Sequence, residues 1–247
     1  MANAFGILAL LLAAVASSGN RPAATPPPAP AEVPSVVVDY SVRSGIYRVT
    51  GDASLLSQRF SPGTSLDLMI AAAALQSGVL TPAMEIPTRD GSMKLPQALK
   101  ESNEEFFSQV LKRTGYEPVR KLLLEARYTP GIPEAVASFA ELARGEPLRV
   151  TVFEQNLFLQ SLVKREIPIT AEHCADLERN LAVTASKPSW GQSGWGEASV
   201  EGPRYVSWFN GAAQLKDGTH VITVAAMTRK PSPAALEQFR RYLTLKR

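Results

Sequence analysis

The chain has 247 residues, of which 45% are hydrophobic and 20% charged, so it can bury a substantial core as one large domain or two small ones. Its formal net charge is only +3, and no dense basic run is interleaved with aromatic residues, which argues against nucleic-acid binding. The single cysteine excludes an intrachain disulfide, and the two histidines lack ligand spacing, so we expect no metal and no other cofactor.

The chain begins with a pattern typical of an export signal. Residues 5–16 form an apolar core, and residues 14–16 offer a small-x-small cleavage site, although no Lys or Arg precedes Arg21. An uncleaved anchor is the alternative, but this apolar core falls short of the ~20 residues that a bilayer span needs. We therefore predict a signal peptide or anchor over residues 1–20. The protein is expected to be exported, periplasmic or in the cell envelope, and to meet a membrane only through an uncleaved N-terminus.

A linker is predicted to precede one folded domain. Residues 21–34 are rich in Pro and Ala, a composition that favours an extended polyproline conformation with little to bury. We expect the domain to cover residues 35–247 and to begin with two strands, at residues 36–40 and 46–49, around a hairpin turn.

Helical periodicity dominates the middle of the domain. Helices are predicted at residues 66–76, 95–100, 104–113, 117–126, 134–142, 152–164 and 171–181. Residues 205–215 and 219–227 then alternate as strands of a hairpin with an Asp-Gly turn, and residues 233–243 form a closing helix. This order predicts an α+β fold in which helices flank an antiparallel sheet.

A few polar positions have plain structural interpretations. Thr170 is a predicted N-cap for the helix that follows it. Cys174, inside that helix, is expected to be buried and inert. We expect His173 on the helix surface and His220 on a strand both to be solvated.

Four segments of the sequence are more informative together, in the order in which they occur, than any one segment is alone. Residues 60–78 run from a Pro-Gly turn into an Ala-rich helix that ends at a glycine. Residues 102–104 read Ser-Asn-Glu and precede an amphipathic helix that also ends at a glycine. Residues 148–169 hold a helix that contains Glu-Gln and exits into a proline, and residues 190–195 read Trp-Gly-Gln-Ser-Gly-Trp.

Taken in this order, residues 35–245 resemble the class D β-lactamase and penicillin-binding transpeptidase superfamily. The resemblance implies an antiparallel sheet flanked by helices, beside a mainly helical subdomain, with the active site between them. In that family three motifs border the site: Ser-x-x-Lys, Ser-x-Asn or Ser-x-Val, and Lys-Thr/Ser-Gly. The serine of the first attacks a carbonyl, and the lysine of that motif handles its proton.

At the first motif the resemblance places Thr64 at the nucleophile and Asp67 at the lysine. A carboxylate thus stands where the family has a proton-accepting amine. Because a negative charge is favourable at a helix N-terminus, we expect Asp67 to stabilise the first turn rather than to act as a base. Ser65 is the alternative nucleophile, although it would put Leu68 at the lysine position.

At the second motif Ser102 matches the family serine, and Glu104 departs from the usual Asn or Val. The Ser102 hydroxyl can lie near a substrate, or it can cap the helix that follows. Both interpretations of Ser102 remain open at this point, and Glu104 is a candidate ligand-binding residue.

At the third motif Gln192 stands where the resemblance implies a lysine that attracts a substrate carboxylate. An amide offers only neutral donors, so such a ligand would lose an ionic partner worth about 1.5–3 kcal/mol. Ser193 and Gly194 fit the motif, and a glycine there lets another backbone approach closely. Trp195 either lines the groove or packs at the strand end.

Three hypotheses about function follow. Loss of a general base alone costs ~10²–10⁴ in rate, and here all three catalytic positions differ. We therefore favour a catalytically inactive domain that binds a peptidoglycan peptide, a β-lactam-like ligand or an envelope protein in the former groove. The alternative is an active acyl-enzyme hydrolase with Thr64 or Ser65 as nucleophile and Asp67 or Glu104 as base. A third hypothesis is an envelope structural protein whose groove is filled by a tryptophan.

Overall fold

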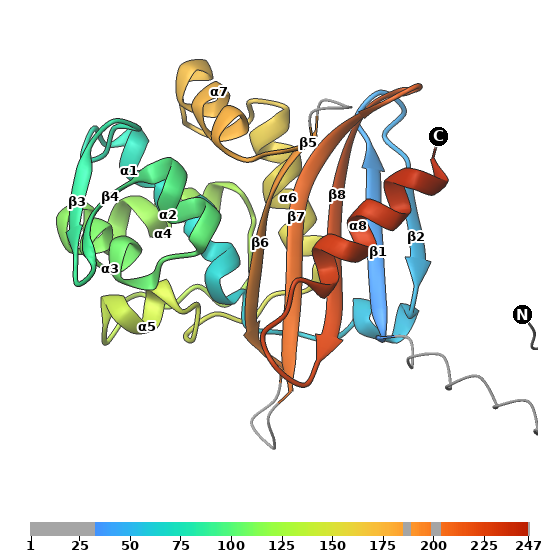
Figure 1. Cartoon of the computed structure of the whole chain (residues 1–247), viewed down its shortest axis with the longest axis horizontal. Helices are drawn as coiled ribbons and strands as arrows, with labels where there is room; N and C mark the ends of the chain where they lie inside the picture. The colour runs from blue at the N-terminus through green and yellow to red at the C-terminus, as the bar shows by residue number, and fades with distance from the viewer. Residues whose placement is uncertain (1–32, 185–188, 199–203, 247) are drawn as a thin grey trace, which may run out of the picture. The chain divides into compact units, whose positions relative to one another are not determined.

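A six-stranded antiparallel sheet organises the folded part of the chain (Figure 1). The computed structural model describes residues 33–184, 189–198 and 204–246, so the predicted signal peptide and most of the predicted linker lie outside the described residues. The strands lie in the order β2-β1-β8-β7-β6-β5. Their bounds are β1 Ser35–Ser41, β2 Tyr47–Gly51, β5 Ala182–Thr184, β6 Ser189–Glu197, β7 Tyr205–Leu215 and β8 Gly218–Thr228.

Helices cover both faces of this sheet. The closing helix α8 (Ala234–Leu245) lies across one face, against β1, β7 and β8, and α6 (Val152–Val163) packs on the other (Figure 1). Under α8, Val37 joins a cluster in which the rings of Phe209 and Phe239 lie 4.2 Å apart. Because the strand residues on either side of Val37 face α6 instead, β1 is apolar on both faces.

A mainly helical subdomain lies beside β6 (Figure 1). Its central helix α1 (Asp67–Gln76) is buried on all sides, as its run of alanines predicts, and the chain leaves it at Gly78, where φ is +70°. This subdomain also contains a short hairpin, β3–β4, that was not predicted from the sequence. The other elements are β3 Glu85–Thr88, β4 Gly91–Lys94, α2 Leu95–Glu101, α3 Glu104–Thr114, α4 Tyr116–Glu125, α5 Phe139–Ala143 and α7 Ala171–Asn180.

The helix predicted at residues 134–142 is the one whose start is wrong. Helix α5 begins only at Phe139, because Ser138 has an extended backbone and its hydroxyl accepts hydrogen bonds from the N–H groups of Ala140 and Glu141. Elsewhere the local signals hold. Thr170 caps α7 as predicted, by accepting a hydrogen bond of 3.1 Å from a backbone N–H of its first turn.

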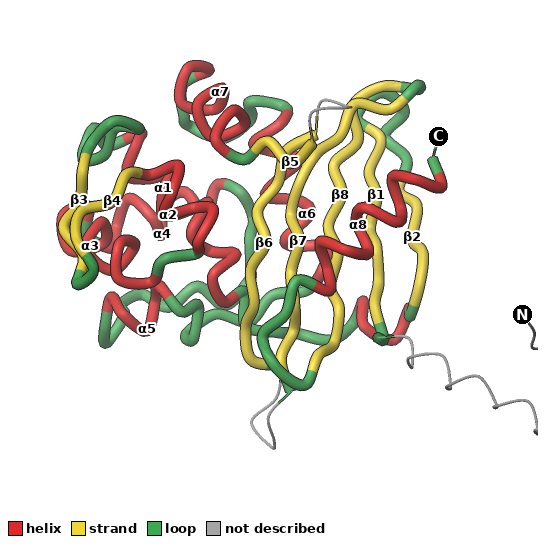
Figure 2. The backbone as a smooth tube through the Cα atoms, in the orientation of Figure 1, coloured by secondary structure: helices red, strands yellow, loops and turns green. Residues whose placement is uncertain are grey.

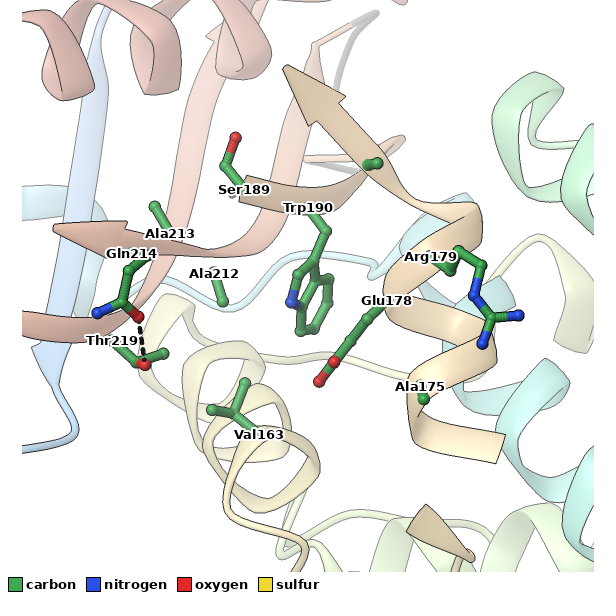
Figure 3. Close-up of a pocket in the computed structure, with 11 residues that line it drawn as sticks. Val163, Ala175, Glu178, Arg179, Ser189, Trp190, Ala212, Ala213, Gln214 and Thr219 are labelled. Atoms are coloured by element: carbon green, nitrogen blue, oxygen red, sulfur yellow. Dashed lines mark hydrogen bonds between the residues drawn. The ribbon is translucent and has the colours of Figure 1, made fainter. Parts of the chain in front are cut away.

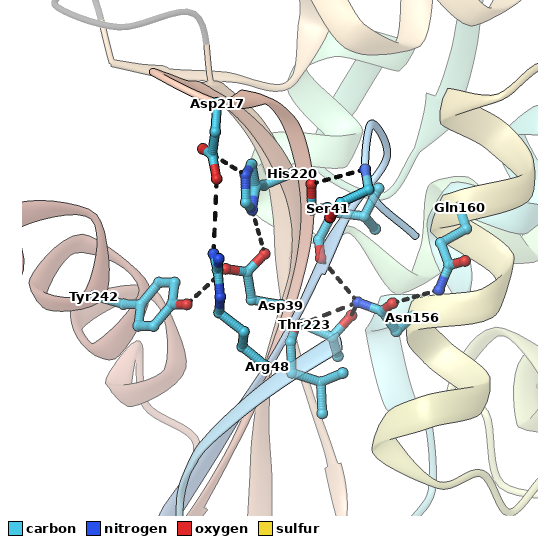
Figure 4. Close-up of polar contacts among 12 residues, drawn as sticks. Asp39, Ser41, Arg48, Asn156, Gln160, Asp217, His220, Thr223 and Tyr242 are labelled. Carbon is cyan, nitrogen blue, oxygen red and sulfur yellow. Dashed lines mark hydrogen bonds and ion pairs between the residues drawn. The ribbon is translucent and has the colours of Figure 1, made fainter. Parts of the chain in front are cut away.

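His220 is not solvated, contrary to the sequence-based expectation. Its ring is fully buried at the start of β8, with Nδ1 2.7 Å from Oδ1 of Asp39 and Nε2 2.9 Å from Oδ1 of Asp217 (Figure 4). Asp39 lies on β1 and also accepts a hydrogen bond of 2.6 Å from the Tyr242 hydroxyl on α8. These contacts tie the first strand, the last hairpin and the closing helix together.

The distribution of helices and strands along the backbone (Figure 2) confirms the predicted α+β class. Cys174 is fully buried in α7, as predicted, and burial raises the pKa of its thiol. Within the described ranges, none of the helices has the length and apolar character that crossing a membrane would require.

Candidate functional site

The turn before α1 lies against β6, and the two backbones touch. This turn is the 3-10 segment η2 (Gly63–Leu66). Gly194 packs on it so closely that a Cβ at this glycine would lie 2.6 Å from the amide nitrogen of Ser65. A hydrogen bond of 3.2 Å from the Ser61 N–H to the Glu197 carbonyl fixes the end of the strand. The close approach therefore brings together the first and the fourth of the segments singled out from the sequence, which hold the first and third motifs.

Thr64, Gln192 and Trp195 meet in this contact. The Thr64 hydroxyl is nearly buried, at 5% exposure, and accepts a hydrogen bond of 3.3 Å from the backbone N–H of Trp195. The Gln192 side chain donates from Nε2 to the carbonyl oxygen of Thr64 at 3.1 Å, while its own Oε1 has no hydrogen-bond partner among the described residues. Gln192 thus holds the turn by a neutral hydrogen bond and brings no charge to it.

Ser65, the alternative nucleophile, is buried and fastens the same turn. Its hydroxyl donates to the Pro62 carbonyl at 2.6 Å and accepts from Nε2 of Gln155 at 2.7 Å. Gln155 belongs to α6, so the Glu-Gln pair of residues 148–169 has a physical function here: it links α6 to the turn. Ser65 could attack a ligand only after releasing the Pro62 carbonyl.

Asp67 lies in the first turn of α1 with its carboxyl fully buried, and neither oxygen has a hydrogen-bond partner among the described residues. Burial raises the pKa of the Asp67 carboxyl well above its usual range, and the nearby charge of Glu104 raises it further. Asp67 lies in the first helical turn as expected, but it makes no capping hydrogen bond there, and desolvation opposes the anionic form that the expectation requires.

We expect the variant Asp67→Asn to alter how stability depends on pH. Below the ordinary Asp pKa of about 3.9 the carboxyl is protonated in both the folded and the unfolded chain. Above that pH the unfolded chain ionises while the folded carboxyl keeps its proton. The wild-type free energy of unfolding then falls by about 1.4 kcal/mol per pH unit until the raised folded pKa is reached. The asparagine variant lacks this loss.

Urea denaturation between about pH 4 and pH 7 measures the effect. The stability of Asp67→Asn relative to wild type should rise with pH across this range. Asp90→Asn removes an exposed carboxyl instead and should leave the pH dependence unchanged. A constant difference between Asp67→Asn and wild type at every pH would mean that Asp67 is ionised in the folded protein.

Ser102 reaches the site from α2 and touches β6 directly. Its hydroxyl donates to the carbonyl oxygen of Ser193 at 3.2 Å, from a backbone with φ of +50° at the end of α2. The alternative that Ser102 caps α3 is wrong, because the side chain of Asn103 accepts the N–H of Phe106 at 2.8 Å and is the N-cap. Ser193 contributes this carbonyl, and its side chain is half-buried.

A small cavity of about 100 Å³ opens beside Thr64. Trp195 forms part of its wall and remains 39% exposed, so it borders the cavity without filling it. The predicted ligand-binding residue Glu104 also lines it and accepts a hydrogen bond of 2.8 Å from Nη1 of Arg144. The Nε of Arg144 bonds to Glu146, another lining residue.

Some residues of the cavity were not predicted from the sequence. Arg144, Glu146 and Arg149 follow α5 in the chain, and Glu197 ends β6. None of them belongs to the three catalytic motifs, although Arg149 lies at the start of the segment 148–169, so only the path of the backbone brings them to Thr64. Among the described residues, no group of three His, Cys, Asp or Glu side chains is placed to hold a metal ion.

A larger cavity, of about 560 Å³, lies away from Thr64, between α6, α7 and the start of β6 (Figure 3). The ring of Trp190 projects into it beside Glu178, and Val163 lies on the opposite wall. None of the residues that we predicted as catalytic lines this cavity. Trp190 and Trp195, the two tryptophans of the third motif, therefore line two different cavities.

The structure is similar to solved class D β-lactamases. For YbXI from Nostoc the TM-score is 0.75 at 20% sequence identity, covering 86% of this chain and 93% of that one. The Bacillus subtilis class D β-lactamase gives 0.74 at 15% identity, covering 87% and 92%. The C-terminal domain of the Bacillus licheniformis BlaR penicillin-receptor gives 0.74 at 18% identity, covering 86% and 91%. No protein-family model and no curated protein matches the sequence. At these identities the likeness shows the fold, and the fold implied by the motifs is confirmed.

Proposed function

We propose that this chain, which has the fold of class D β-lactamases and penicillin-receptor domains, is an exported ligand-binding domain that does not transfer acyl groups. One observation carries the proposal. Among the described residues, the Thr64 hydroxyl has a single hydrogen bond, and in it the hydroxyl is the acceptor. A hydroxyl nucleophile needs a neighbouring base that takes its proton.

The two side chains at the family's lysine positions do not supply that base. Asp67 is buried in surroundings that favour its neutral form, and Gln192 is a neutral amide engaged with a backbone carbonyl. A missing general base costs ~10²–10⁴ in rate. Because Gln192 also lacks the charge that would attract a substrate carboxylate, little acyl transfer is expected.

The proposed ligand is a cell-wall peptide, with an envelope protein as the other candidate. Trp195 and several charged side chains surround a small cavity beside Thr64, and such a mixture of an aromatic surface and polar groups suits a peptide. One structural neighbour, the BlaR domain, is itself described as a penicillin-receptor, which illustrates that this fold serves in recognition as well as in hydrolysis. The export-signal pattern at the N-terminus supports a place in the cell envelope.

An acyl-enzyme hydrolase is the second candidate, and one observation favours it. The N–H of Trp195 points at the Thr64 hydroxyl, and a backbone N–H in such a position can stabilise an oxyanion without any side chain. The test of the proposed function therefore has to detect a covalent adduct.

Intact-mass spectrometry after incubation with benzylpenicillin is that test. We expect no gain in mass, whereas a class D β-lactamase treated identically should acquire a penicilloyl adduct. An adduct that disappears in Thr64→Ala but persists in Ser65→Ala would establish the acyl-enzyme alternative. Binding is measured separately by co-sedimentation with purified peptidoglycan, and failure to sediment would remove the cell-wall peptide as the ligand.

A further inference from the structure

Among the residues that the structure describes, five charged side chains line the cavity beside Thr64, and they divide into two groups. Arg144 forms ion pairs with Glu104 and Glu146, so these three side chains satisfy one another. Arg149 and Glu197 remain. They have opposite charges, and neither forms an ion pair with the other or with any other described residue.

Arg149 is anchored but keeps unused donors. Its Nη1 donates to the carbonyl oxygens of Glu146 and Leu148, at 2.7 and 2.8 Å, which holds the guanidinium in place without neutralising it. A guanidinium carries five N–H donors, so an anion can still bind to the remaining ones. Arg149 is therefore a fixed positive charge at the cavity wall.

Glu197 is held by its backbone while its side chain is exposed. Its carbonyl oxygen accepts the Ser61 N–H at 3.2 Å, which fixes the end of β6 against the turn. Glu197 lines the same cavity as Arg149, and its carboxylate has no ion-pair partner among the described residues. Trp195, two residues earlier on β6, presents a ring that is 39% exposed next to it.

The size of the cavity limits the ligand. Its volume of about 100 Å³ is well below the roughly 300 Å³ at which pockets for drug-sized molecules begin, so only a small molecule or the end of a larger one fits. A ligand of this size can still contact both walls. A purely anionic ligand would approach the unpaired carboxylate of Glu197, and a purely cationic one the guanidinium of Arg149, so each would be repelled by one wall.

We propose that this cavity binds a small zwitterion, an amino acid or a peptide end that carries both a carboxylate and an ammonium group. The carboxylate pairs with Arg149, and the ammonium with Glu197 beside the face of Trp195, where a cation is also attracted by the ring. This inference rests on the proposed function, since it names the ligand class of the same groove. It also assigns Arg149 and Glu197 as the residues that determine specificity.

Titration with alanine, followed by protein NMR at the Trp195 indole N–H, tests the proposal. We expect a saturable shift with a dissociation constant on the order of 1 mM, as befits so few non-hydrogen atoms. Propionate lacks the ammonium group and ethylamine lacks the carboxylate, so each should bind at least about tenfold more weakly. Comparison of D-alanine with L-alanine then shows which enantiomer the cavity prefers.

Variants locate the binding groups. Arg149→Gln and Glu197→Gln should each weaken alanine binding about tenfold or more, while Arg89→Gln, at an exposed arginine outside the cavity lining, should leave it unchanged. The double variant Arg149→Glu with Glu197→Arg restores both charges in exchanged positions and should recover binding. Unchanged thermal unfolding of each variant confirms that the fold is intact.

The outcomes separate this inference from the proposed function. Propionate binding as tightly as alanine, or alanine binding that survives both Gln variants, would overturn the zwitterion site without affecting the claim that no acyl transfer occurs. No detectable alanine binding to wild type would also overturn it. A benzylpenicillin adduct on Thr64 would overturn the proposed function, whatever alanine does.

Discussion

Replacement of Gly63 by alanine is expected to destabilise the protein by roughly 2–5 kcal/mol, the sum of two effects. The φ of Gly63 is +54°, a region that costs an L-residue about 1–2 kcal/mol. A Cβ there would also lie 1.6 Å from the carbonyl oxygen of Trp195, so β6 would have to move, and overpacking of this kind costs about 1–3 kcal/mol.

Gly45 provides the matched control for this substitution. Its φ is +71°, but a Cβ at this position would have no atom within 4 Å, so Gly45→Ala isolates the backbone strain of about 1–2 kcal/mol. Urea denaturation followed by tryptophan fluorescence measures both variants. Equal losses of stability in the two variants would show that β6 does not pack tightly against the turn before α1. That result would contradict the close contact that assembles the site.

Replacement of His220 by alanine is expected to cost about 3–5 kcal/mol of stability. The imidazole and the Asp39 carboxyl are both fully buried and bonded to each other at 2.7 Å, so the variant leaves Asp39 with only the Tyr242 hydroxyl. Removing one partner of a buried pair is costly because the other is left desolvated without compensation. Removal of the imidazole ring also leaves a cavity at the buried start of β8, which lowers the stability further.

The other partner of His220 supplies the comparison. The Asp217 side chain is 54% exposed, and the amide of an asparagine can still hydrogen-bond to the ring, so Asp217→Asn should cost less than about 1 kcal/mol. Urea denaturation at one pH measures both. A double variant with Asp39→Ala tests the coupling, since adding this change to His220→Ala should cost less than the two single losses together. Strict additivity, or an equal loss for Asp217→Asn, would mean that the buried pair does not stabilise the fold.

Local sequence predicted most elements because their signals act over a few residues. Thr170 caps its helix with a side chain next to it in the chain, and the Asp-Gly pair turns the last hairpin without distant help. The start of the helix after Ser138 was misplaced because residues 134–137 contain neither Gly nor Pro, so only the cap geometry shows where the helix begins. The β3–β4 hairpin was missed because its strands have four residues each, too few for a clear period.

The sequence predicted which residues form the candidate site, but it did not predict which of them are charged, neutral or hydrogen-bonded. The motif order placed Thr64, Gln192 and Trp195 together, and the structure brings them into direct contact. Whether a polar side chain is charged or neutral, bonded or free, depends on atoms contributed by other segments. We expected Asp67 to be a stabilising anion, whereas its carboxyl is fully buried and has no hydrogen-bond partner in the part of the chain that the structure describes.

The α+β class could be predicted from the amino-acid sequence because periodicity, caps and turn residues act over a few neighbouring residues. The residues that meet at the junction of the turn, α2 and β6 were implied by the family resemblance, which the order of the motifs carries. Contacts between distant segments were needed to show that His220 is buried between two aspartates and that Ser65 holds the turn. The same is true of Arg149 and Glu197, which line one cavity, neither with an ion-pair partner among the described residues. Burial and pairing depend on contacts between segments far apart in the chain, and these contacts control the cost of desolvating each polar group.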